Sequence, residues 1–232
     1  MTDQGRTVEP PQTDDSATSV FDATRFKIIA IGVIAALAGL MSGLDIGVVA
    51  GALDLIGKEY HASTLALEWV VSSMMAGAAA GALGAGWLSH HLGRKRSLIL
   101  GAAVFVVGTL GCAMGWSIPS IIVFRIIMGI AVGISAFTAP LYLSEIASEE
   151  SRGAMVSTYQ LMVTVGIFVA FLSDTYFSYS ENWRWMFGFA VLPAVRFLIG
   201  VLCLPYSPRW LIMQGRHKEA REILVDLRND PL

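Results

Sequence analysis

The chain has 232 residues, of which 55% are hydrophobic and only 15% are charged, and its formal net charge is −2. Because a soluble domain carries about 25% charged residues, this composition predicts an all-α membrane protein that crosses the bilayer several times. The net charge does not suggest a nucleic-acid partner, and no metal-ligand spacing, nucleophile–base pair or glycine-rich phosphate loop suggests a metal, a cofactor or an enzyme.

The beginning of the chain is polar. Two adjacent prolines, two adjacent aspartates and several Ser and Thr occupy this segment, which therefore cannot bury a hydrophobic core. We expect residues 1–25 to form a disordered cytoplasmic tail and residues 26–205 to form a transmembrane domain. Residues 206–232 should form a cytoplasmic amphipathic helix and a truncated linker.

Six later segments are apolar enough to cross a membrane, which takes about 20 apolar residues per helix. Pro140 and Pro193 fall within two of these segments, where proline should kink or stop the helix. The short connection at 116–120 predicts a tight hairpin. The expected spans are 27–51, 69–89, 97–116, 119–143, 154–174 and 184–204.

The distribution of Lys and Arg predicts the orientation, because cytoplasmic loops carry an excess of these residues. They precede the first span and follow the second, fourth and sixth spans. Both termini should therefore be cytoplasmic, and the segment 215–228 should lie as an amphipathic helix on the cytoplasmic face. The opposite side carries mostly acids, namely Asp54, Glu59, Glu68, Asp174 and Glu181.

One acid lies deep within the first span. Asp45 is 18 residues beyond Lys27, which corresponds to about 27 Å along a helix. Arg125 lies six residues after Pro119 in the fourth span, which is about 9 Å in from the outer end of that span. Counted from opposite ends, the two charges fall at similar depth. Since each charge is costly alone within a membrane, their similar depth predicts that they pair.

This pair has more than one interpretation. It is either a proton switch, in which the acid takes up a proton when the arginine moves away, or a static ion pair that only fixes helix packing. A third interpretation of Asp45 is a helix-end acid in the headgroup region. Glycines spaced four apart in both spans, Gly39 with Gly43 and Gly129 with Gly133, favour close contact between the two spans.

Gln160 lies about two turns inside the fifth span. A buried amide needs hydrogen-bonding partners. It makes either an interhelical hydrogen bond, as in many membrane bundles, or lines a cavity that accepts a polyhydroxylated ligand. The residues themselves leave these two interpretations open.

Three motifs link the chain to a known family. They are the basic turn at 86–96 (GWLSHHLGRKR), the segment 140–145 together with 152–153, and the segment 205–211 (PYSPRWL). Together they resemble the sugar-porter branch of the major facilitator superfamily. Within that branch, the segments 68–75 (EWVVSSMM) and 159–162 (YQLM) look most similar to the bacterial arabinose– and galactose–proton symporters. The resemblance implies one six-helix half of a twelve-helix fold in the cell inner membrane, moving a monosaccharide together with a proton.

The resemblance also implies roles for individual residues. Asp45 matches the protonatable acid of the first span, Arg125 matches its arginine partner, and Gln160 matches a glutamine that contacts the sugar. The other matches form a cytoplasmic charge network that locks the outward-facing state, namely Gly93, Arg94, Glu145, Arg152 and Arg209. The implied partners are a small sugar, a proton and the lipid bilayer, without a cofactor, a metal or a catalytic residue.

The chain departs from the family pattern at several positions. His90 and Tyr206 each replace an acid of a motif, and Ile167 stands where some members have a second sugar-contacting glutamine. Arg196 lies near the middle of the sixth span, where these symporters have an apolar residue. It must face a cavity, reach the interface or destabilise its helix.

Length is the largest departure. The family has twelve spans in two halves, whereas this chain offers the first half and the helix that follows it. We therefore expect that a second copy or another half-transporter chain completes the pathway. The alternative is a truncated, non-transporting membrane protein or a scaffold.

Overall fold

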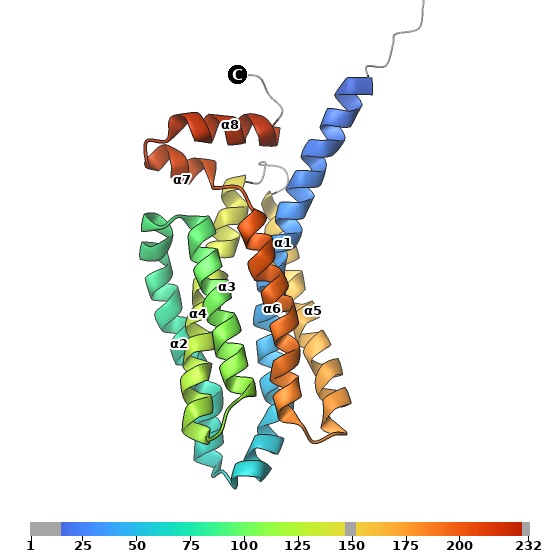
Figure 1. Ribbon diagram of the computed structural model, residues 1–232, viewed down its shortest axis with the longest axis vertical. Helices are drawn as coiled ribbons and strands as arrows, with labels where there is room; N and C mark the ends of the chain where they lie inside the picture. The colour runs from blue at the N-terminus through green and yellow to red at the C-terminus, as the bar shows by residue number, and fades with distance from the viewer. Residues whose placement is uncertain (1–14, 147–151, 229–232) are drawn as a thin grey trace, which may run out of the picture.

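The computed structural model describes residues 15–146 and 152–228, and no strand occurs among them. Six helices are long and apolar enough to cross a membrane, and two short helices follow them (Figure 1). The helices are α1 (Asp15–Tyr60), α2 (Thr64–His91), α3 (Arg94–Ala113), α4 (Ile118–Ile146), α5 (Arg152–Ser178), α6 (Trp183–Cys203), α7 (Pro208–Met213) and α8 (His217–Arg228). The all-α fold with six spans is therefore confirmed.

The helices pack as pairs around α1 and α4. Helix α1 packs mainly against α5, helix α4 mainly against α2, and α3 and α6 join the two pairs. Helices α7 and α8 lie across one end of the bundle, which we call the α7–α8 end, and the α3–α4 turn lies at the other, the α3–α4 end (Figure 1). The apolar face of α8, with Ala220 and Ile223, packs on Trp210 and Leu211 of α7.

The predicted spans correspond to the helices with shifted ends. The tight hairpin is present, because only residues 114–117 separate α3 from α4. Pro140 and Pro193 both lie inside continuous helices, so neither proline stops its helix. Membrane bundles tolerate such prolines because neighbouring groups satisfy the freed backbone carbonyls.

The beginning of α1 differs from the predicted tail. Residues 1–14 lie outside the described part of the chain. For these residues the expected disorder of 1–25 stays a prediction. From Asp15 onward the backbone is helical and continuous with the first span. Residues 15–31 contain no proline or glycine that would end a helix.

Glycines set the spacing within the two main helix pairs. Gly129 and Gly133 of α4 lie against the backbone of α2 at Met74 and Ala78. Gly43 of α1 lies against the backbone of α5. The glycine faces that we expected to join α1 to α4 therefore join each of these helices to a different neighbour.

Candidate functional site

The two deeply placed charges form a buried ion pair. The guanidinium of Arg125 on α4 donates from Nη1 to Oδ1 of Asp45 on α1 over 2.8 Å. The exposed fractions of the two side chains are 2% for Arg125 and 0% for Asp45. The structure therefore brings together the two residues whose depth predicted pairing, and it places both side chains in the bundle interior.

Arg125 also links α2 to this ion pair through its other guanidinium nitrogens. Its Nε donates to the carbonyl oxygen of Val70 over 3.1 Å, and its Nη2 lies 3.5 Å from the sulfur of Met74. Oδ2 of Asp45, in contrast, has no hydrogen-bond partner among the described residues. One carboxylate oxygen is thus held by the arginine, while the other is available to a proton.

Gln160 lies on a different surface. It is exposed on α5, and its neighbour one turn further, Thr164, is exposed as well. Among the described residues its side chain makes no hydrogen bond, and Tyr159 and Val163 provide the adjacent contacts with α1. The structure does not bring Gln160 into the Asp45–Arg125 contact.

A second charged cluster lies at the α7–α8 end. Arg94 donates to Oε1 of Glu145 from Nη2 over 2.7 Å and from Nε over 3.1 Å. The hydroxyl of Ser207 donates to Oε2 of the same carboxylate over 2.5 Å. Glu145 therefore joins the start of α3, the end of α4 and the start of α7.

Gly93 has a conformational reason to be glycine. Its φ is 87°, and an added Cβ would lie 2.8 Å from Cε2 of Trp210. The indole Nε1 of Trp210 donates to the carbonyl oxygen of His90 over 3.0 Å. The basic turn and α7 therefore fit together closely at a point where a side chain would be strained.

The other two predicted members of this network are Arg152 and Arg209. The side chain of Arg152, the first residue of α5, lies outside the described residues. Arg209 is exposed and forms no ion pair within the described part of the chain. Sequence reasoning did not single out Ser207, although a serine followed by proline is a typical helix start, and its Oγ accepts from the amide of Trp210.

Tyr206 replaces the expected acid by an aromatic ring. The ammonium of Lys95 lies 5.0 Å from the ring centroid, and the guanidinium carbons of Arg96 and Arg216 lie 5.9 Å from it. The ring also stacks on Trp210. Cation–π attraction therefore acts at the position where the family pattern has a carboxylate.

Arg196 is exposed on α6 and has no hydrogen bond or ion pair with the described residues. Its side chain therefore points away from the interior of this bundle. The structure thus places Arg196 on the surface of the bundle, and each of the three expected solutions for it stays a prediction.

Glu145→Gln is expected to loosen α7 from the bundle, because the amide keeps the shape of the side chain but loses the charge that Arg94 and Ser207 bind. A charge-assisted hydrogen bond contributes about 1.5–3 kcal/mol, so amide exchange over residues 207–213 should accelerate about tenfold or more. Hydrogen exchange measured by mass spectrometry checks this. The control is Glu219→Gln, which breaks the half-exposed Arg216–Glu219 pair, and equal exchange in both variants would contradict the prediction.

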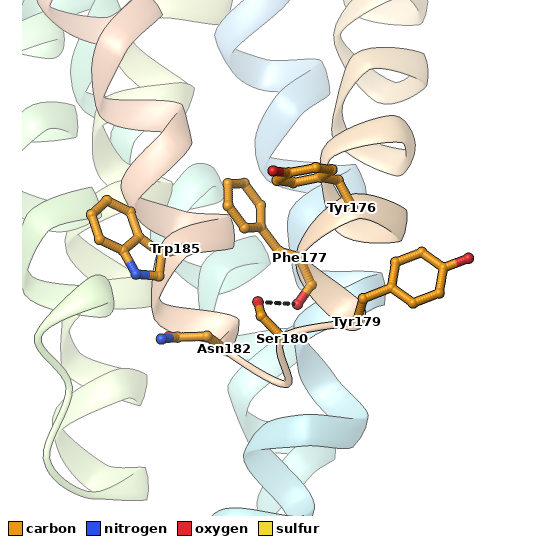
Figure 2. A pocket seen from close by; sticks show the side chains of 6 residues that line it. All are labelled: Tyr176, Phe177, Tyr179, Ser180, Asn182 and Trp185. Carbon is orange, nitrogen blue, oxygen red and sulfur yellow. Dashed lines mark hydrogen bonds between the residues drawn. The ribbon is translucent and has the colours of Figure 1, made fainter.

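A hollow of about 700 Å³ lies at the α3–α4 end of the bundle, where α5 turns into α6. Figure 2 shows the aromatic side chains of Tyr176, Phe177, Tyr179 and Trp185 around it, with Ser180 and Asn182 on the turn. Tyrosine and tryptophan commonly gather at the membrane–water interface. None of the predicted proton or sugar residues lines this hollow.

The family model described as "Sugar (and other) transporter" matches residues 31–232. The arabinose-proton symporter of Escherichia coli (strain K12) is 58% identical over 211 residues, which are 91% of this chain and 44% of that protein. The galactose-proton symporter of the same strain is 55% identical over 196 residues, covering 84% of this chain and 42% of that protein.

Solved structures match as well. The proton:xylose symporter XylE bound to 6-bromo-6-deoxy-D-glucose superposes with a TM-score of 0.83 at 27% identity, over 88% of this chain and 50% of XylE. An inward open conformation of XylE from E. coli gives a TM-score of 0.80 at 26% identity, over 88% of this chain and 53% of that one. The chain thus spans about half the length of the relatives that it matches.

Proposed function

The chain belongs to the Sugar (and other) transporter family, and on this premise we propose that it forms the proton-binding half of a sugar–proton symporter. The relatives that match it are transporters and not enzymes. Its six apolar helices make it a multi-pass membrane protein. The specific sugar, the completed assembly and the residue roles are what the proposal adds.

The Asp45–Arg125 pair carries the proposal. A proton that adds to Oδ2 of Asp45 neutralises the carboxylate without displacing the 2.8 Å contact at Oδ1. The ionic attraction between α1 and α4 then falls, while Arg125 remains tied to α2 through the Val70 carbonyl. Protonation therefore favours conformations in which α1 is free to move relative to α4.

The sugar would bind at the exposed face of α5. An amide both donates and accepts hydrogen bonds, as sugar hydroxyl groups require. Gln160 offers such an amide without a partner among the described residues, and Thr164 adds a hydroxyl one turn away. We propose arabinose or galactose as the substrate class, because the most similar relatives reported above are named for these sugars.

A second six-helix unit would complete the pathway. The spans of α2 and α5 are the least buried of the six, so their free faces are available to a partner. That partner is either a second copy of this chain or another half-transporter. Alternating access then follows from rocking of the two units around the sugar and the proton.

The α7–α8 end would face the cytoplasm of a bacterial cell, with both termini on that side of the inner membrane. Lys and Arg at this end favour that orientation. Here Gly93, Arg94 and Glu145, together with Arg152 and Arg209, would form the cytoplasmic gate. Arg94 and Glu145 already hold α3, α4 and α7 together, as a closed gate requires.

Asp45→Asn is expected to abolish uphill sugar accumulation while sparing exchange, because the amide cannot take up and release a proton. The test uses cells without their own sugar symporters, supplied with labelled arabinose or galactose, with and without a protonophore. The chain is expressed alone and together with the C-terminal half of the E. coli arabinose-proton symporter. Accumulation that the protonophore abolishes supports the proposal.

The matched control is Asp54→Asn, which removes an exposed acid from the same helix. It should accumulate sugar as the unmodified chain does. If the Asp45→Asn variant accumulated sugar at the unmodified level, Asp45 would not be the coupling acid. If inserted chain transported no sugar in either combination, the proposed function itself would fail.

A further inference from the structure

A second carboxyl group is buried in the bundle. Asp174 lies one turn before the end of α5, within the apolar span Gly153–Ser178, and its exposed fraction is only 5%. From the sequence, Asp174 is expected among the acids at the outer ends of the spans. The helix instead continues to Ser178, and this continuation directs Asp174 toward α1.

Asp174 contacts α1 at a glycine. An added Cβ on Gly51 would lie 2.4 Å from Oδ2 and 2.5 Å from Cγ of Asp174. Gly51 follows Gly39, Gly43 and Gly47 at intervals of four residues, and all four glycines face α5. The first three glycines lie against backbone atoms of α5 or the methyl group of Ala170, whereas Gly51 lies against the carboxyl group of Asp174.

This carboxyl group has no partner in the described part of the chain. Neither Oδ1 nor Oδ2 has a hydrogen bond there. The charged residues near this end of the bundle on α1, on the α5–α6 turn and in the first turn of α6 are Asp54, Lys58, Glu59, Glu181 and Arg184, and Arg196 lies about three turns further along α6. Lys58 pairs with Asp54 over 2.9 Å and Arg184 pairs with Glu59 over 2.8 Å, so neither cation pairs with Asp174.

Asp45 and Asp174 are therefore different kinds of buried acid. Asp45 is balanced by Arg125, whereas Asp174 lies against the backbone of Gly51 and pairs with no cation in the described part of the chain. Burial of an unbalanced carboxylate is costly, and such a group is relieved by taking up a proton. We propose that Asp174 is a second proton-binding site, and that its protonated form closes the α1–α5 contact at the α3–α4 end.

Release of the Asp174 proton is coupled to separation of α1 and α5 at this end of the bundle. The carboxyl group can release its proton only when it reaches water, which requires that α5 separates from Gly51. Opening of the helix pair at this end and loss of the proton therefore occur together. The inference concerns the folded chain itself, so it stands whether or not the chain transports sugar.

Infrared spectroscopy of the full chain in lipid tests the site directly. A protonated carboxyl group has a C=O stretch that an ionised carboxylate lacks. At neutral pH we expect this band in the unmodified chain and in the control Asp54→Asn, and we expect its loss in Asp174→Asn. Persistence of the full band in Asp174→Asn, or no band in the unmodified chain, would overturn the proposal.

Gly51→Ala provides a variant that leaves the acid in place. The added methyl group would lie 2.4 Å from Oδ2 of Asp174, so the carboxyl group must move and the infrared band should shift or weaken. The control is Gly84→Ala, where an added Cβ meets no atom within 4 Å. If Asp174→Asn does not fold, a band in Gly51→Ala identical to that in Gly84→Ala overturns the proposal.

Discussion

Arg125→Leu is expected to reduce the free energy of unfolding by about 3–5 kcal/mol, because it leaves the Asp45 carboxylate buried without its cation. The two side chains are almost completely buried, and 2.8 Å separates Nη1 from Oδ1. The substitution also leaves the Val70 carbonyl oxygen without the donor Nε of Arg125. Denaturant unfolding of the chain in detergent, followed by tryptophan fluorescence, measures the loss.

Two further variants separate charge from packing. Lys58→Leu breaks an ion pair whose side chains are 69% and 81% exposed, and it should cost no more than about 1 kcal/mol. The double variant Asp45→Asn with Arg125→Leu leaves no uncompensated charge, so it should recover most of the loss. An Arg125→Leu variant as stable as Lys58→Leu would show that Asp45 does not carry a buried charge in the folded chain.

The sequence predicts this pair because the depth of a residue within a span depends only on its position along that helix. A helix rises by a fixed distance per residue, so counting from Lys27 and from Pro119 places Asp45 and Arg125 at one level without knowledge of the packing. The six spans follow from apolar length in the same way. Both inferences use only short-range regularities, and the structure contains both features.

Neighbour relations are harder to predict, because they depend on which face of each helix meets which partner. The glycines of α4 at Gly129 and Gly133 meet α2 and not α1. The contact of Gly93 with Trp210 joins positions that are far apart in the sequence. Asp174 could have been found by extending the buried positions Tyr159 and Ala170 of α5 by one more turn, but the expected span ended at that residue.

Gly43→Ala is expected to push α1 away from α5 and to cost about 1–3 kcal/mol of stability. An added Cβ would lie 2.0 Å from the carbonyl oxygen of Val163 and 2.9 Å from the amide nitrogen of Ile167. Both obstacles are backbone atoms, so no side chain can rotate away. An added Cβ on Gly166 of α5 would lie 2.3 Å from the carbonyl oxygen of Leu40, which shows that both helices use glycine at this crossing.

The control for this prediction is again Gly84→Ala, with open space around the added Cβ. Equal unfolding free energies for the two variants would show that the crossing tolerates a side chain. Gly43 also stands two residues before Asp45, so a displacement of α1 must move the acid relative to Arg125. The cost of Arg125→Leu should therefore be smaller in the Gly43→Ala background, with a coupling of about 0.5–3 kcal/mol. Strict additivity would mean that α1 bends locally at Gly43, whereas a coupling in this range would mean that α1 moves as one rigid element between α5 and the buried ion pair.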